Sequence, residues 1–274
     1  MTEWNSLRVE RGDDGVVEVV LTGPGKGNAM GPDFWRELPE LFTALDEDRS
    51  ARAVLLRGEG EHFSYGLDVK AMMGELGPHF MGDNLAASRA ALLDLIGRMQ
   101  RGCDLVARCR KPVIAAVSGW CIGGGLDLAS ACDVRYASRE ARFSLREVKL
   151  AIVADVGSLQ RLPAIIGQAR TREMAFTGGD YDAAWALRAG LVNEVYDSPA
   201  ELLAAARERA REVARNAPLS VQGIKQVMDY CADKSVADGL RYVAVWNSAF
   251  LQSKDLGEAI TAFMERRAPT FTGE

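Results

Sequence analysis

Short apolar runs alternate with longer amphipathic stretches over the first two-thirds of the chain. Runs rich in Val, Ile, Leu and Ala predict buried or half-buried strands, and stretches whose apolar residues recur every three or four positions predict helices. This alternation predicts an α/β domain. The predicted strands are Val16–Leu21, Arg52–Gly58, Pro112–Val117 and Cys132–Ala137, and the predicted helices are residues 33–48 and 86–109.

The pattern changes after Tyr196, where the strand-like runs stop. Asp197-Ser198-Pro199 has the residues of a helix start, since Ser accepts from free N–H groups and Pro is tolerated in the first turn. The helices that follow carry apolar residues on more than one stripe of their surface. This predicts that they pack on the core and on other subunits. These helices are predicted at residues 198–218, 219–232, 236–251 and 254–267.

Composition and charge narrow the class of protein. The 274 residues are 48% hydrophobic and 26% charged, as in soluble globular domains. The net charge of −5 argues against a general nucleic-acid binder, and no apolar run reaches membrane-spanning length. The termini lack signal, transit and peroxisomal patterns, and the five cysteines form no CxxC pair. We therefore expect a cytoplasmic protein with reduced thiols.

Three glycines at positions 123–125 stand directly ahead of a helix-like LDLASA. Glycine lets a ligand approach the backbone, and a helix start offers free N–H groups to an anionic oxygen. Three carboxylates follow among apolar neighbours, at Asp127, Glu147 and Asp155. Such surroundings raise carboxylate pKa values, which suits proton transfer. Because the chain has only two histidines, we expect no metal site and no redox cofactor.

Each of these features also has a simpler interpretation. A glycine triplet can be a tight turn. Asp127 can cap a helix or face solvent, and Asp155 can be the N-cap of the helix that follows it. Glu147 lies between Arg146 and Lys149 and can form a surface ion pair of little energetic value.

Five segments, in this order and spacing, resemble the crotonase superfamily of enoyl-CoA hydratases and isomerases. The resemblance implies a crotonase-type ββα spiral core over residues 1–197 and a C-terminal helical oligomerisation region over residues 198–274. It also implies a homotrimer or a dimer of trimers. The segments are Val17–Gly31, His62–Met72, Lys111–Ala137, Glu147–Gly167 and Ala262–Gly273.

Within the superfamily the likeness is greatest to the Δ3,5-Δ2,4-dienoyl-CoA isomerases. Typical hydratases have glutamates at the positions of Asp127 and Glu147, and a PGAGG-like segment where this chain has ADVGS and the extra acid Asp155. One departure is residues 149–151, Lys-Leu-Ala, where a more acidic or glycine-containing segment is expected. This departure bears on substrate shape rather than on reaction type.

The resemblance implies an isomerase that converts 3,5-dienoyl-CoA to 2,4-dienoyl-CoA in fatty-acid β-oxidation. Glu147 matches the acid/base that acts at C2 of the substrate, and Asp155 matches the acid that reaches C6. Asp127, the third acid of this catalytic set, matches a supporting polar group near the reacting atoms. The backbone N–H groups of Leu67 and Gly124 match the two donors that stabilise the thioester enolate.

The resemblance also implies contacts to the CoA part of the substrate, so that no separate cofactor is needed. Lys26 is expected near the phosphates or the adenine, and Tyr65 frames the pantetheine channel together with Leu67. Phe263 and Arg266 match positions that reach CoA, often from a neighbouring subunit. A solvated Arg266 is an equal alternative, because terminal helices are commonly basic.

Two other functions stay open at this point. An enoyl-CoA hydratase would use Asp127 and Glu147 to add water, and Asp155 is the feature against it. A noncatalytic acyl-CoA-binding member of the superfamily is the second alternative, and the three acids with the glycine triplet argue against it.

Overall fold

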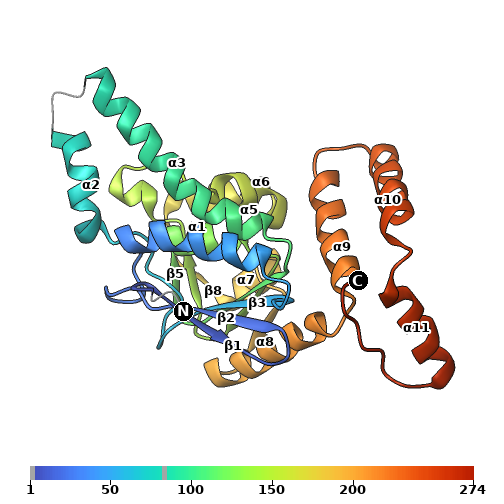
Figure 1. Cartoon of the computed structure of the whole chain (residues 1–274). Helices are drawn as coiled ribbons and strands as arrows, with labels where there is room; N and C mark the ends of the chain where they lie inside the picture. Colours follow the sequence, from blue (N-terminus) through green and yellow to red (C-terminus); the bar gives the residue numbers. More distant parts are fainter. Residues whose placement is uncertain (1–3, 82–84) are drawn as a thin grey trace.

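A computed structural model of the chain describes residues 4–81 and 85–274 (Figure 1). Strands and helices alternate as far as β9, and only helices follow. The strands are β1 (Leu7–Arg11), β2 (Val16–Leu21), β3 (Ala53–Gly58), β4 (Val113–Val117), β5 (Trp120–Ile122), β6 (Val134–Ser138), β7 (Arg142–Ser144), β8 (Tyr181–Asp182) and β9 (Glu194–Tyr196). The helices are α1 (Pro32–Glu47), α2 (Val69–Met81), α3 (Ala86–Arg108), α4 (Gly124–Ala131), the 3₁₀ helix η1 (Glu147–Leu150), α5 (Ser158–Ile166), α6 (Gln168–Thr177), α7 (Ala183–Ala189), α8 (Pro199–Ala214), α9 (Pro218–Cys231), α10 (Val236–Phe250) and α11 (Lys254–Glu265).

Two sheets organise the body of the molecule. The larger has the strand order β1-β2-β3-β4-β6-β9, in which β1 is antiparallel to β2 and all other neighbours are parallel. The smaller sheet has the order β5-β7-β8. Parallel neighbours require crossover connections, and helices such as α1 and α3 supply them. The α/β class expected from the sequence is confirmed.

Successive side chains of a strand point to opposite faces, so each strand of the large sheet contributes to two apolar clusters. In β2, Val17 and Val19 join the main core with α1 and α3, whereas Val16 joins a cluster on the opposite face. That opposite face is covered by α8 (Figure 1). The α8 residues in contact recur every fourth position and are mostly small, which lets the helix lie close to the sheet: Leu202, Ala206, Ala210 and Ala214.

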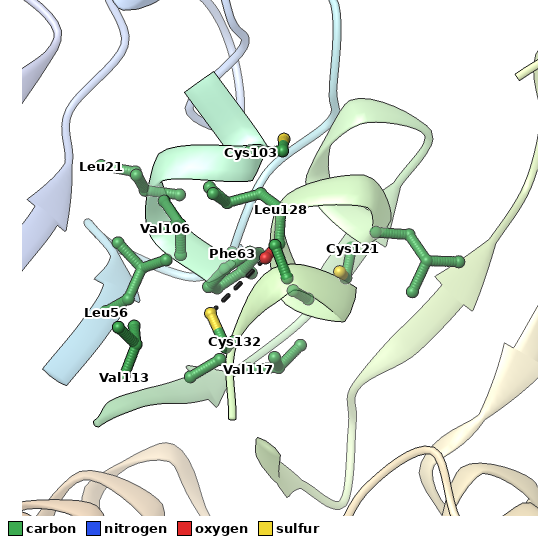
Figure 2. Close-up of a cluster of buried hydrophobic side chains, with 14 of the residues drawn as sticks. Leu21, Leu56, Phe63, Cys103, Val106, Val113, Val117, Cys121, Leu128 and Cys132 are labelled. Atoms are coloured by element: carbon green, nitrogen blue, oxygen red, sulfur yellow. Dashed lines mark hydrogen bonds between the residues drawn. The ribbon is translucent and has the colours of Figure 1, made fainter. Parts of the chain in front are cut away.

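The main core fills the space between the large sheet, α3 and α4. Figure 2 shows Leu56 and Val117 from the strands opposite Val106 of α3 and Leu128 of α4. The thiol of Cys132 lies among them and donates to the Leu128 carbonyl at 3.4 Å. Burial raises the pKa of this thiol to about 12, so it is unreactive.

Helices α9, α10 and α11 form an arm to one side of the body, joined to it through α8 (Figure 1). The Lys225 ammonium on α9 contacts the Asp133 carboxylate just before β6 at 2.8 Å, and Arg52 donates to the Phe271 carbonyl at 2.7 Å. The arm exposes large apolar side chains, among them Ile224 and Phe263. The four C-terminal helices expected from the sequence are confirmed, while the division at residue 197 stays a prediction.

Every predicted strand and the two predicted helices of the first two-thirds occur within one or two residues of the expected bounds. The sequence patterns did not reveal β1, the small sheet or β9, nor the helices α2, η1, α6 and α7. Strands of two or three residues, such as those of the small sheet, carry too few positions for a period to be recognised. Among residues 4–81 and 85–274, no helix is long and apolar enough to span a membrane.

Candidate active site

The glycine triplet forms the junction between β5 and α4. Gly123 has φ +51°, a conformation that side-chain-bearing residues rarely adopt, and a β-carbon there would lie 3.0 Å from the Glu147 Oε1 atom. Its own N–H donates to the Ser144 carbonyl of β7 at 3.0 Å. The glycine triplet is therefore a tight turn, as in its simpler interpretation, and it also brings the backbone close to the Glu147 carboxylate.

The two predicted oxyanion donors lie side by side. A β-carbon built on Gly124 would be 3.6 Å from the amide nitrogen of Leu67 and 3.2 Å from the Met30 sulfur. Met30 forms an isolated β-bridge with Leu67, in which the Met30 N–H donates to the Gly66 carbonyl at 2.7 Å and the Met30 carbonyl accepts from the Asp68 N–H at 3.0 Å. Within the described part of the chain, neither the Leu67 nor the Gly124 N–H donates to a protein acceptor. Two unpaired donors thus share one small space.

Asp127 lies in the first turn of α4 and is almost fully buried, with 1% exposure. Its Oδ1 atom accepts a hydrogen bond from the backbone N–H of Ser158, the first residue of α5, at 2.6 Å. Burial raises the pKa of Asp127 to about 6, although hydrogen bonds from Ser158 lower it. The solvent-facing alternative for Asp127 is therefore wrong. The acid binds the start of a neighbouring helix.

Glu147 begins η1 and points one oxygen at the glycine turn. Its other oxygen, Oε2, is buried and has no hydrogen-bond partner among residues 4–81 and 85–274. Burial, with a smaller effect of the nearby charges of Asp127 and Asp155, raises the pKa of Glu147 to about 7. The surface ion pair with Arg146 is not formed, because that guanidinium contacts Asp180 at 2.6 Å.

Asp155 lies in the segment between η1 and α5. Burial raises its pKa. The residue that precedes α5 is Gly157, so Asp155 is not the N-cap of this helix, and the simpler interpretation of Asp155 is wrong. The backbone carbonyl of Asp155 accepts a hydrogen bond from the Gln100 side chain of α3 at 2.7 Å.

An apolar cavity of about 310 Å³ opens beside the acids. Glu147 lines it together with apolar side chains of η1, the Asp155 segment and helices α5 and α6, among them Val148, Ile152, Leu159 and Phe176. A pocket with one raised-pKa carboxylate in an apolar wall suits a largely apolar ligand that exchanges a proton. A larger hollow of about 520 Å³ lies within the arm and contains none of the predicted site residues.

Two of the four predicted CoA contacts lie near the site. Lys26 is exposed on the loop after β2, and the following Gly27 fits under the Tyr65 ring, which a β-carbon would approach to 2.8 Å. Tyr65 also stacks on His62 at 5.0 Å, and His62 accepts from the Trp120 N–H, as expected for a locally packed histidine. Lys26 and Tyr65 therefore belong to loops adjoining Leu67.

Phe263 and Arg266 do not reach the acids within one chain. Both lie at the end of α11, and Figure 1 shows that helix far from β5 and α5. Phe263 is 85% exposed, and Arg266 is exposed at the left-handed residue that ends α11. Their role at the site stays a prediction that requires a neighbouring subunit.

Sequence reasoning missed two residues that hold the site together, Gln100 and Ser158. Ser158 follows a glycine at a helix start, where a free N–H needs a partner, and this was the one available signal. Gln100 is one of many polar residues on α3, and nothing in the pattern distinguishes it. Within the described residues, no group of three or more His, Cys, Asp or Glu residues has a geometry that could hold a metal ion.

Comparison with known proteins adds independent information. The model of the enoyl-CoA hydratase/isomerase family matches residues 11–274. A protein of Dictyostelium discoideum named Delta(3,5)-Delta(2,4)-dienoyl-CoA isomerase, mitochondrial, is 42% identical over 99% of this chain and 92% of its own length. Its peroxisomal namesake from Arabidopsis thaliana is 40% identical over 99% and 98%. The crystal structure of an enoyl-CoA hydratase from Bacillus anthracis superposes with a TM-score of 0.89 at 31% identity, covering 98% of this chain and all of that one.

The expectation of a cytoplasmic location was wrong. The relatives just described are named mitochondrial and peroxisomal, which does not fit a cytoplasmic location. The expectation rested on targeting patterns that were not recognised and on cysteines without a CxxC pair, and neither observation identifies a compartment. The expected crotonase fold, in contrast, is confirmed by the superposition.

Proposed function

This chain belongs to the enoyl-CoA hydratase/isomerase family, and we propose that it is a Δ3,5-Δ2,4-dienoyl-CoA isomerase of fatty-acid β-oxidation. The observation that carries the proposal is Asp155. It is a second partly buried acid with a raised pKa, near Glu147, and it does not cap α5. Moving two double bonds along a chain requires proton transfer at two separated carbons, and two acids provide it.

In the proposed reaction the Glu147 carboxylate removes a proton from C2 of the 3,5-dienoyl-CoA. The electron pair of that C–H bond forms an enolate whose charge is delocalised over the diene as far as C6, and both double bonds stay in place until C6 is protonated. Asp155 in its protonated form then delivers a proton to C6, and the 2,4-diene results. One proton is taken and one is given, so no water or redox partner is consumed, and a proton passes through solvent from Glu147 to Asp155 before the next turnover. The pKa of Glu147, about 7, places its two protonation states close in free energy near neutral pH.

The enolate oxygen requires donors that are already in place. The N–H groups of Leu67 and Gly124 are unpaired in the described chain and adjacent, which supports their role as the oxyanion hole. Removing one such donor costs about 2.7–4 kcal/mol of transition-state stabilisation in other enzymes. The apolar cavity beside Glu147 would exclude water from the enolate and take the alkyl part of the acyl chain.

Hydration is the less well supported alternative. A hydratase would orient water with Asp127 and Glu147 together, but Asp127 is sealed at 1% exposure and already accepts from Ser158. A buried carboxylate that already accepts a hydrogen bond is poorly placed to bind the water molecule that hydration consumes. A noncatalytic role is opposed by the unpaired buried oxygen of Glu147, because an uncompensated polar atom costs stability and marks a site kept for chemistry.

The acyl-CoA substrate would meet Lys26 and Tyr65 from this chain, and Phe263 and Arg266 from a neighbour. The arm supports self-association, because an isolated chain would leave Phe263 and other large apolar side chains in water. A trimer or a dimer of trimers would cover them. The division into a spiral core and an oligomerisation region belongs to the same proposal.

The test is direct. With a 3,5-dienoyl-CoA, the purified protein should produce a conjugated 2,4-dienoyl-CoA, seen as a rise in near-ultraviolet absorbance. Hydration of a simple 2-enoyl-CoA, measured in parallel, should be much slower. Efficient hydration without diene isomerisation would overturn the proposal in favour of the hydratase, and tight CoA binding without either reaction would favour the noncatalytic alternative.

A further inference from the structure

The segment that carries Asp155 is held from two sides. On one side the Asp127 carboxylate of α4 accepts from the Ser158 N–H at 2.6 Å. On the other side the Gln100 amide of α3 donates to the Asp155 carbonyl at 2.7 Å. Each contact fixes backbone within three residues of the Asp155 side chain. The position of that carboxyl group therefore depends on two side chains that lie on other helices.

Helix α5 cannot cap itself. Its N-cap position is Gly157, which has no side chain and has φ +130°, where side-chain-bearing residues are strained. The side chain of Arg161 also fills the space where a β-carbon of residue 157 would lie. A carboxylate from outside the helix is thus the one available partner for the buried Ser158 N–H, and Asp127 supplies it.

Asp127 is less accessible to solvent than the other two acids. Its 1% exposure contrasts with Glu147 and Asp155, which are only partly buried. Glu147 lines the apolar cavity and so does Ala154, the neighbour of Asp155, while the side chains of Asp127 and Asp155 themselves do not. A group that exchanges protons with a substrate must be reachable by it, and a group that holds a backbone need not be.

We propose that Asp127 is a positioning residue: it holds Ser158 so that Asp155 can deliver the C6 proton, and it transfers no proton itself. The proposal rests on the proposed isomerase function and deepens it, because it gives the supporting acid a defined task, which is to hold the backbone next to Asp155. Gln100 acts in the same way from the opposite side of the segment. Neither residue touches the substrate.

The experiment compares Asp127→Asn with Asp127→Ala. Asparagine keeps a side-chain oxygen that accepts from the Ser158 N–H but cannot transfer a proton, whereas alanine removes the acceptor. Two rates are measured on each protein, the isomerisation of a 3,5-dienoyl-CoA and the exchange of the C2 hydrogen with solvent deuterium. The second rate reports Glu147 and the oxyanion hole without requiring Asp155.

Asp127→Asn should retain isomerisation within less than tenfold of the wild type, far short of the ~10²–10⁴-fold loss of an acid–base group. Asp127→Ala should lose about 10²-fold in isomerisation, as for a misplaced catalytic group, and should keep its C2 exchange. Gln100→Met keeps the length of the side chain and removes its donor. It should lower the ratio of isomerisation to C2 exchange, as Asp127→Ala does, but by a smaller factor.

Equal losses of 10²-fold or more in both Asp127 variants would make Asp127 a proton-transfer group and overturn the proposal. Full isomerisation by Asp127→Ala, or parallel loss of both rates, would overturn it as well. If Asp127→Ala fails to fold, Asp127→Asn still tests whether Asp127 transfers a proton. Gln100→Met then tests whether contacts from other helices position Asp155. A wild-type protein that does not isomerise dienes contradicts the proposed function itself, which is a separate result.

Discussion

The amide nitrogen of Leu67 would lie 3.6 Å from a β-carbon on Gly124, so the absence of a side chain at position 124 keeps the space beside both N–H groups open. The two residues come from different parts of the chain. Leu67 follows the loop after β3, and Gly124 begins α4. The Ser64–Cys121 bridge holds the loop that carries Leu67 against the segment that leads into Gly124. This pair is the geometric basis of the proposed oxyanion hole.

Gly124→Val should reduce isomerase turnover by about 10²–10³-fold, because the new side chain would displace the thioester from the donors. The fold should survive, since the nearest atom is the Met30 sulfur at 3.2 Å, on a flexible side chain. Steady-state kinetics and thermal unfolding check both statements. Gly97→Val is the matched control, because Gly97 lies exposed on α3 and a β-carbon there would have no other atom within 4 Å. Wild-type kinetics in a folded Gly124→Val protein would contradict the assignment.

Glu147→Gln and Asp155→Asn should each lower kcat by about 10²–10⁴-fold with a smaller effect on KM. The two variants should differ in how fast the C2 hydrogen of the substrate exchanges with solvent deuterium. Asp155→Asn keeps some deuterium exchange at C2, because Glu147 and the donors remain, and Glu147→Gln loses it. Mass spectrometry of recovered substrate measures the exchange, with Glu140→Gln, on an exposed turn, as the control. Isomerisation by Asp155→Asn at the wild-type rate would move the hydratase alternative to first place.

Activity and stability should depend on pH in different ways. Burial raises the pKa of Glu147 from 4.5 to about 7 and that of Asp127 from 3.8 to about 6. The folded chain therefore binds more protons than the unfolded chain between about pH 4 and about pH 7, and its free energy of unfolding falls as pH rises through this window. A base at Glu147 must be deprotonated and an acid at Asp155 protonated, so kcat/KM should instead rise with pH as Glu147 loses its proton and fall again once Asp155 loses its own.

Urea unfolding and initial rates over the same buffers measure the two trends. Glu147→Gln should flatten the stability profile, because glutamine does not titrate. A wild-type free energy of unfolding that rises between about pH 5 and about pH 8 would show that these carboxyl groups are not held in their neutral form.

Lys225→Met should lower the free energy of unfolding by about 1–3 kcal/mol, the cost of leaving a partly buried polar partner unsatisfied. The Lys225 side chain is 8% exposed and contacts Asp133, which also accepts from the Val113 N–H at 2.7 Å. Lys234→Met removes an exposed pair with Asp233 and is the control, with no measurable change expected. Equal stability of the two variants would show that this ion pair does not anchor the arm.

Local patterns were sufficient for the long elements. The run Val113–Val117 and the stripe of α1 were recognisable because strand and helix periods are properties of adjacent residues. The glycine triplet and the three acids among apolar neighbours were visible in the sequence, and the resemblance to a known family gave the acids their expected roles. The short strands β5, β7 and β8 were not, because they are stabilised by pairing with one another across the chain.

The tertiary structure decided which partner each recognised residue has. A helix start after Asp155 was correctly anticipated, but the acid that binds it is Asp127, which lies 31 residues before Ser158. Likewise Gly124 was a clear candidate, whereas its neighbour Leu67 comes from a distant loop. The sequence by itself determined the longest helices, the main strands and the kinds of chemical group available, since these depend on local period and residue type. Only folding decided which acid is sealed and which stays open, because burial and hydrogen bonding arise between segments that are far apart along the chain.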